Sequence, residues 1–249
     1  MIETLIKSHF PEAKTGAEIT ETYLNFIVGE YGSQLDKILF ATSLCCDDIN
    51  VSTDFRRVLT RPFTLGGLGG LPYAGITGMT AYAHHIPDGG DAFIFYGPHI
   101  GISDVGELGK LRRPGQAHLT NSCGALVLAL ERLNSHSNIL PERYELDAQQ
   151  LMLERSLHPL KESGASVIEI KQALNFTYYN VRNRLLKLIK ASRSEFNCDR
   201  IFLLGGIIIN TSPEFNDYVD IRNFEVLNPR EIQDADYTSI LASQAFKDL

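Results

Sequence analysis

Two cysteines and a histidine occupy places in this sequence that suit metal ligands. Cys45 follows an uncharged apolar run at residues 38–41, and His99 follows a second such run at residues 92–96. Cys123 begins a segment, residues 124–133, with the apolar pattern of a buried helix. Open α/β sheets bind ligands just beyond the carboxyl ends of their strands, so side chains placed there are expected to meet. The sequence therefore predicts a metal site with three ligands, Cys45, His99 and Cys123.

Two thiolates and one imidazole are typical of catalytic zinc, which keeps one position open, whereas structural zinc has four protein ligands. Asp47 lies two residues after Cys45. Its carboxylate can accept a hydrogen bond from a water on the metal, or can occupy the fourth position itself. The alternative interpretation is that the cysteines are buried packing residues and that His99 is a hydrogen-bonded turn residue.

Hydrophobic patterns predict the elements that must position these residues. Apolar runs predict strands, and apolar residues at three- and four-residue spacing predict helices. The mixture indicates an α/β protein. The predicted strands are residues 38–41, 92–96, 200–209 and 224–227, and the predicted helical regions are residues 1–35 and 145–195.

Two loops are expected to lie at the site. The glycine-rich residues 63–75 allow close backbone approach. They lack the lysine and Ser/Thr of a P-loop, so we expect them to cover a small cavity rather than hold a nucleotide. Residues 101–115, which include Arg112 and Arg113, predict a long loop that returns to the site, because long loops in compact domains are usually functional.

Length and composition limit the classes of protein to consider. We interpret residues 1–249 as a single zinc-binding domain with an N-terminal helical segment (1–35), a metal-site core (36–133), and a helical layer with C-terminal strands (134–249). A net charge of −7 and a pI of about 5.5 argue against a nucleic-acid partner. Strand-length apolar runs argue against a membrane span, and an early acidic residue, Glu3, against a secretory signal. We therefore expect a cytoplasmic protein.

Five motifs of the sequence belong together. They are SLCCDDIN (43–50), GGLGGLPYAGITG (66–78), AHHIPDGG (83–90), YGPHIG (96–101) and Cys123-Gly124. These motifs resemble the limiting-carbon-dioxide-inducible protein B family of algae and bacteria, most closely over residues 35–130. That family is similar to the β-class carbonic anhydrases in fold and zinc site. The resemblance implies a β-carbonic-anhydrase-like α/β fold, with a small, mostly parallel sheet flanked by helices.

The resemblance also implies an activity. The chain would be a zinc-dependent carbonic anhydrase, a lyase that interconverts carbon dioxide and bicarbonate through a zinc-bound hydroxide. Asp47 would be the aspartate of a catalytic dyad. The β-class enzymes place an arginine two residues after that aspartate, where this chain has Ile49. Arg57 is expected to take that part, with Arg56 as the alternative.

The choice of histidine also rests on the resemblance. His99 is preferred as the zinc ligand because the β-class enzymes take theirs from a Gly-His end of a strand. His84 and His85 are the alternatives, and either could instead relay protons, so His85 is included among the candidate catalytic residues.

Two other functions and an assembly state complete the expectations. Some members of the resembled family are inactive, so the alternative is a zinc-binding sensor or scaffold, and a further alternative is a zinc hydrolase of another small substrate. The apolar helix face formed by Ile19, Tyr23, Phe26 and Ile27, together with the resemblance, predicts a homodimer.

Overall fold

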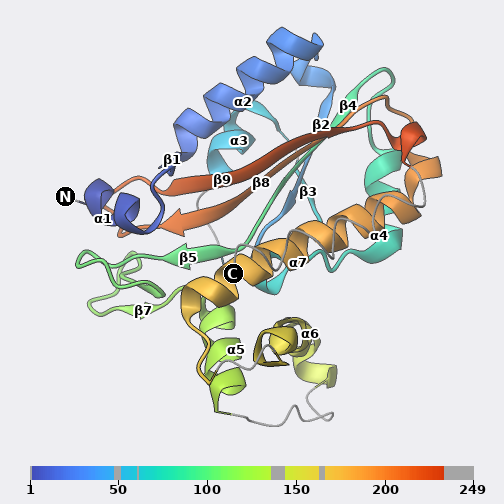
Figure 1. Ribbon diagram of the computed structural model, residues 1–249. Helices are drawn as coiled ribbons and strands as arrows, with labels where there is room; N and C mark the ends of the chain where they lie inside the picture. The colour runs from blue at the N-terminus through green and yellow to red at the C-terminus, as the bar shows by residue number, and fades with distance from the viewer. Residues whose placement is uncertain (1, 48–51, 61, 136–143, 163–165, 233–249) are drawn as a thin grey trace.

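The computed structural model describes residues 2–47, 52–60, 62–135, 144–162 and 166–232. In this part of the chain, a seven-stranded sheet forms the centre of the molecule (Figure 1). Strands β2, β3, β4, β5 and β8 are parallel, and β9 and β1 continue the sheet in antiparallel fashion. The order is β1 (Lys14–Thr15), β9 (Tyr218–Leu227), β8 (Ile201–Asn210), β4 (Asp91–Tyr96), β2 (Ile38–Ser43) and β3 (Phe63–Thr64), and β5 (His99–Gly101) also pairs with β8.

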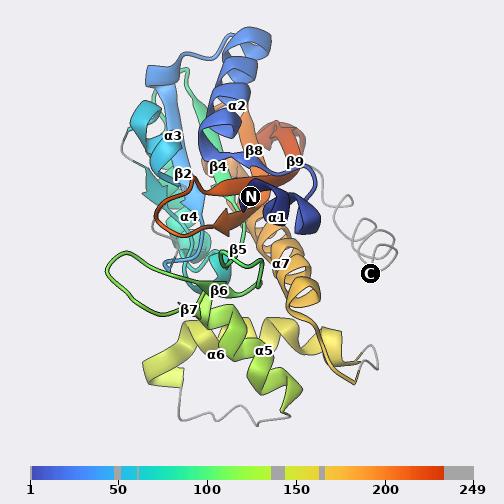
Figure 2. The ribbon, with the colours of Figure 1, turned by 90° about the vertical axis from the view of Figure 1, so that its left-hand side faces the viewer.

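Helices cover both faces of this sheet (Figures 1 and 2). One face carries α2 (Gly16–Tyr31) and α3 (Ser52–Val58), and the other carries α4 (Gly75–His84) and α7 (Ile170–Ala191). Beyond α7 lie α5 (Gly124–Asn134) and α6 (Tyr144–Glu162). The shorter elements are α1 (Ile2–His9) and the two-stranded sheet of β6 (Lys110–Leu111) and β7 (Thr120–Asn121). The mostly parallel sheet with flanking helices confirms the predicted fold class.

The covered faces explain why the strand sequences are so apolar. Every residue of β4 and of β8 is buried, as expected for strands packed on both sides. Two separate clusters of buried side chains result, one for each face. Phe40, Phe93 and Phe95 pack under α2 and α3, whereas Ala41, Ile94 and Tyr96 pack under the helices of the opposite face.

The N-terminal region differs from its prediction. Residues 1–35 were expected to be one helical segment, but β1 separates α1 from α2 because Lys14 and Thr15 pair with β9. The apolar face of α2 packs on the protein's own sheet, with the Tyr23 and Phe26 rings 5.3 Å and 5.7 Å from the ring of Phe224. Ile19 and Ile27 are buried by this packing, whereas Phe26 stays 44% exposed, and the homodimer stays a prediction.

None of the described helices is both long enough and apolar enough to cross a membrane. The division of residues 1–249 into three segments of one domain stays an interpretation.

Candidate metal centre

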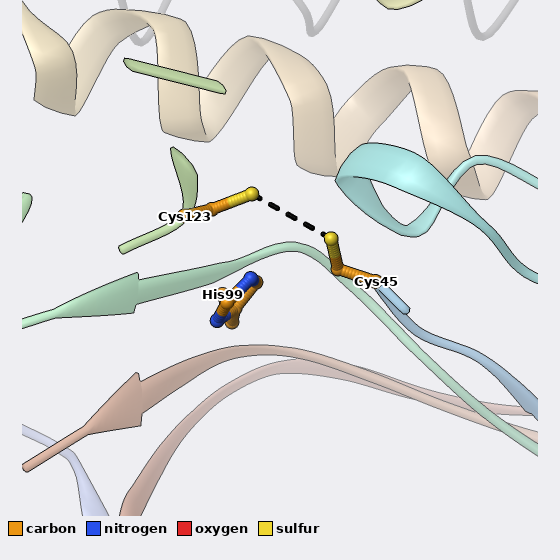
Figure 3. A group of neighbouring side chains, drawn as sticks. All are labelled: Cys45, His99 and Cys123. Carbon is orange, nitrogen blue, oxygen red and sulfur yellow. Dashed lines mark hydrogen bonds between the residues drawn. The ribbon is translucent and has the colours of Figure 1, made fainter. Parts of the chain in front are cut away.

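Cys45, His99 and Cys123 come together in the interior of the molecule (Figure 3). Their ligand atoms all lie within 4.8 Å of one another, and the two sulfurs are 3.5 Å apart. The exposed fractions of the three residues are 2%, 1% and 1%. The structure thus assembles the three residues that the sequence predicts as ligands, while their role as ligands stays a prediction.

Each of the three is delivered by a different element. Cys45 lies just beyond the end of β2, His99 is the first residue of β5, and Cys123 is the N-cap residue of α5.

A break between β4 and β5 directs His99 toward the cysteines. β4 pairs with the first half of β8 and β5 with the second half, and the register of β8 shifts between Gly205 and Gly206. At the break the backbone at Gly97 lies so close to β8 that a Cβ at Gly97 would be 1.7 Å from the Gly206 carbonyl oxygen. Glycine at position 97 is therefore required for His99 to leave β4 in this direction.

The glycine-rich loop contacts the site through its backbone. The Gly69 N–H donates to Cys45 Sγ over 3.2 Å. Gly69 has a positive φ of 67°, which favours glycine, and a Cβ at Gly70 would lie 2.4 Å from the Gly97 carbonyl oxygen. The loop lies against the site and supplies a donor to the sulfur. Its residues are not among those that line the cavity described below, so its part as a cover for a cavity stays a prediction.

Hydrogen bonding determines which nitrogen of His99 faces the sulfurs. His99 Nδ1 lies 2.6 Å from Asn210 Oδ1, a carbonyl oxygen that accepts. Nδ1 therefore carries the proton, and Nε2 carries the lone pair. Neutral imidazole with one such lone pair is the form that binds metals.

The carboxylate of Asp47 lies beside the cluster and accepts hydrogen bonds from two residues. Arg113 Nη2 is 3.2 Å from both carboxylate oxygens, and the Gly124 N–H donates to Oδ2 over 3.3 Å. The same Oδ2 is 3.9 Å from His99 Nε2. An ionised carboxylate is thereby fixed next to the lone pair of the imidazole without belonging to the cluster itself.

This arrangement corrects the predicted partner of Asp47. Arg57 instead lies 3.5 Å from Asp54, with its own side chain 74% exposed, and Arg56 is exposed on the same helix. The partner is Arg113, 66 residues after Asp47, between β6 and β7. The signal for it was present in the sequence, because residues 101–115 were expected to return to the site. Ile49, where the β-class arginine would stand, lies outside the described residues.

His84 and His85, the two alternative candidates for the ligand, lie away from the cluster. His85 Nδ1 lies 2.6 Å from the Ala81 carbonyl oxygen at the end of α4, and the side chain is exposed. His84 pairs with Glu195 over 2.8 Å. The structure therefore gives neither residue a place among the three converging side chains, and the proposed relay role of His85 stays untested.

A cavity of about 480 Å³ adjoins the cluster. Its lining includes Asp47, Arg113 and Asn210, and also Arg57 and Asp54. Charges of both signs therefore surround the space. Arg57 faces the same cavity as Asp47 even though the two do not pair.

Comparisons with known proteins identify a family and similar folds. A family model described as limiting CO2-inducible proteins B/C β-carbonic anhydrases matches residues 15–228. The crystal structure of PtLCIB4, a homolog of the limiting CO2-inducible protein LCIB, superposes with a TM-score of 0.82 at 31% identity, covering 91% of this chain and 95% of that one. The crystal structure of LCIB itself is similar in fold, with a TM-score of 0.66, 18% identity, and coverage of 88% and 92%. Among curated proteins, none matches.

Proposed function

Because this chain belongs to the limiting CO2-inducible protein B/C β-carbonic anhydrase family, we propose that it interconverts carbon dioxide and bicarbonate with a zinc ion. The observation that carries the proposal is the convergence of two buried thiols and one buried imidazole, with ligand atoms within 4.8 Å of one another. The proposed ligands are Cys45, His99 and Cys123.

The chemistry of this donor set fits zinc. Thiolate sulfur and imidazole nitrogen are zinc ligands, whereas magnesium and calcium take oxygen. Within the part of the chain that the structure describes, no fourth histidine, cysteine or carboxylate joins the cluster at 4.8 Å. Three protein ligands leave the open position of a catalytic site. When bound there, zinc would act as a Lewis acid and bring the pKa of a water down toward neutrality.

Asp47 is proposed to orient the reacting water. Its Oδ2 is 3.9 Å from His99 Nε2, close enough to accept a hydrogen bond from a water between the ligands. Arg113 and the Gly124 N–H hold the carboxylate in place through the hydrogen bonds that it accepts from them. The same two donors compete with any metal for the carboxylate, which keeps Asp47 from closing the open position.

The cavity is proposed as the route for substrate and product. Its volume of about 480 Å³ is ample for carbon dioxide and for bicarbonate. Among its lining residues, Arg113 is the cation that lies nearest Asp47, and it would attract the bicarbonate product as well as hold the carboxylate. Arg57 lines the same space.

Metal analysis and a hydration assay test the proposal on the same samples. Purified protein is expected to carry zinc, and Cys45→Ala and Cys123→Ala are expected to lose both zinc and carbon dioxide hydration in a stopped-flow pH-indicator assay. The matched control is Cys198→Ala, because Cys198 is also a buried free cysteine, 3% exposed, but lies outside the cluster. Equal zinc content in Cys45→Ala and Cys198→Ala would contradict the ligand assignment.

The same assays separate the alternative functions. Zinc binding without hydration would favour a sensor or scaffold. The cavity is larger than carbon dioxide requires, which keeps a zinc hydrolase of another small substrate as the second candidate, and a chromogenic ester assay on the zinc-loaded protein tests it. The cytoplasmic location, the homodimer and the absence of nucleic-acid and membrane partners stay predictions, and light scattering addresses the homodimer.

A further inference from the structure

A chain of hydrogen bonds leads from His99 away from the cysteines to a carboxylate. His99 Nδ1 contacts Asn210 Oδ1 over 2.6 Å, and Asn210 Nδ2 donates to Asp217 Oδ2 over 3.3 Å. The other oxygen of Asp217, Oδ1, accepts the Thr211 N–H over 2.8 Å. Asn210 is 3% exposed, at the last position of β8.

Strand register explains how Asn210 reaches the imidazole. In the parallel pair β5·β8, His99 lies opposite Ile208 and Gly101 lies opposite Asn210. Alternate residues of a strand share a face, so His99 and Asn210 lie on the same face of the sheet. From this face the Asn210 amide reaches the ring of His99, with Oδ1 2.6 Å from Nδ1.

The carboxylate of Asp217 determines which group donates and which accepts in each of these hydrogen bonds. An ionised carboxylate only accepts hydrogen bonds, so Asp217 requires the NH₂ group of Asn210 to face it. The carbonyl oxygen of Asn210 must then face His99. A carbonyl oxygen also only accepts, so His99 carries its proton on Nδ1 and presents the Nε2 lone pair to the sulfurs of Cys45 and Cys123.

We propose that Asn210 and Asp217 are positioning residues, which hold His99 in the tautomer and ring orientation that binds the metal. The inference rests on the proposed metal site. Groups that orient a metal-binding histidine from behind typically change metal affinity by about 10- to 100-fold when they are lost. Here the orienting group would be the neutral amide of Asn210. The carboxylate of Asp217 determines which end of that amide faces His99.

The first test uses metal-free protein, so it does not depend on catalysis. ¹⁵N NMR of histidine-labelled protein at pH 8 reports which ring nitrogen carries the proton, and the His99 signals are assigned by their loss in His99→Gln. The parent is expected to show His99 protonated on Nδ1. Asn210→Ala is expected to show a mixture of tautomers.

The second test measures zinc affinity by competition with a chromophoric chelator. Asn210→Ala is expected to weaken zinc binding about 10- to 100-fold. Asp217→Asn is expected to weaken it by a smaller factor, because an amide oxygen can still accept from Asn210 in one of its two orientations. Asn216→Ala is the matched control, since it removes an exposed amide from the same loop and should leave the affinity unchanged.

A reciprocal exchange distinguishes hydrogen-bond polarity from packing. In Asn210→Asp alone, two carboxylates face each other, and zinc binding should weaken. In the double variant Asn210→Asp/Asp217→Asn, the new carboxylate accepts from His99 Nδ1 and from the new amide, whose oxygen still accepts the Thr211 N–H. The double variant is expected to recover zinc affinity to within about threefold of the parent.

Three results would overturn the inference. They are a parent His99 protonated on Nε2, zinc affinity within threefold of the parent in both Asn210→Ala and Asp217→Asn, and a double variant no better than Asn210→Asp. Should Asn210→Ala fail to fold, Asp217→Asn and the double variant decide the matter. A parent that binds no zinc at all refutes the proposed function, whereas the tautomer measurement judges the role of Asn210 and Asp217 independently of that result.

Discussion

At the scale of single residues, the proposed function depends on the groups that hold the carboxylate of Asp47. They are proposed to keep it from occupying the fourth position on the metal. Arg113 contacts both of its oxygens at 3.2 Å. Besides this contact, Arg113 Nη1 donates to the Asn121 carbonyl oxygen over 3.0 Å. The guanidinium is therefore tied to β7 at one end and to Asp47 at the other, which gives it a defined position rather than the freedom of a surface side chain.

Removal of this guanidinium should affect activity more than metal binding. Arg113→Ala is expected to retain zinc but to lower carbon dioxide hydration by about 100-fold, because a misplaced carboxylate no longer orients the water. Arg113→Lys should recover only part of the rate, since an ammonium lacks the planar fork of donors. Stopped-flow rates and zinc content check both variants.

Arg57→Ala provides the comparison for that experiment. Arg57 pairs with Asp54 and is largely exposed, so its removal should cost less activity than removal of Arg113. A larger loss of hydration activity in Arg57→Ala than in Arg113→Ala would show that the contact between Arg113 and Asp47 is not the one that matters for turnover.

The sequence predicted the three side chains that converge in the structure but not the residues that support them, for a physical reason. Cys45, His99 and Cys123 have side chains with metal chemistry and stand at the ends of predictable elements. Arg113 and Asn210 are ordinary polar residues, and only the three-dimensional register of β5 with β8 and the return of the β6–β7 segment bring them to the site. Arg57, the expected partner, lies ten positions after Asp47 in the sequence yet pairs with Asp54.

At the scale of elements, the break between β4 and β5 is the feature that positions the histidine. It depends on the contact of Gly97 with Gly206, where no Cβ fits. A side chain at position 97 must therefore move one strand away from the other.

Gly97→Ala is expected to destabilise the protein by about 3 kcal/mol through overpacking and to weaken zinc binding, because His99 follows two residues later. Urea unfolding and chelator competition measure the two effects. Gly29→Ala is the control, since a Cβ there meets nothing within 4 Å and a helical alanine should stabilise α2 by about 0.5–1 kcal/mol. Normal stability in Gly97→Ala would be incompatible with the tight contact described above.

The start of α2 provides a prediction with a pH dependence. Thr15 Oγ1 accepts the Glu18 N–H, and the Glu18 carboxylate accepts the Thr15 N–H, which forms a capping box. Hydrogen bonds from the Thr15 side chain and backbone lower the pKa of Glu18 below its ordinary value. A lowered folded-state pKa contributes stability above the ordinary pKa of glutamate, and that stability is lost as the pH falls through the folded-state pKa.

Thr15→Ala is therefore expected to cost about 1 kcal/mol of unfolding free energy at pH 7 and less at pH 3. Urea unfolding at the two pH values measures the difference. Thr22→Ala, an exposed change within the same helix, should show no such pH dependence. An equal cost of Thr15→Ala at both pH values would mean that Glu18 adds nothing to the cap.

The same element scale shows where hydrophobic patterns succeed and fail. The long strands β2, β4 and β8 were predictable because burial on both faces demands uninterrupted apolar runs. The two-residue strands β1 and β6 carry no such pattern, since their pairing depends on partners far along the chain. The interruption between α1 and α2 was missed for this reason.

At the scale of the whole molecule, the candidate metal ligands connect parts of the fold that are otherwise separate. Cys45 follows a central strand, His99 begins β5 beside β8, and Cys123 begins a helix that packs mainly on α6 rather than on the sheet. A metal ion bound by all three would tie the sheet to the α5–α6 pair. Such a link forms in the native state and is lost on unfolding.

Zinc should therefore stabilise the folded chain by mass action. At a free zinc concentration 100-fold above Kd, the expected gain is about 2.7 kcal/mol, which for a chain of this size corresponds to a rise in Tm of about 5–10 °C. Differential scanning calorimetry of metal-free and zinc-loaded protein measures this shift. Cys45→Ala should show almost none of it, whereas Cys198→Ala should show all of it, because only the first removes a ligand from the cluster. A zinc-dependent rise that is the same in both variants would place the bound metal elsewhere on the molecule.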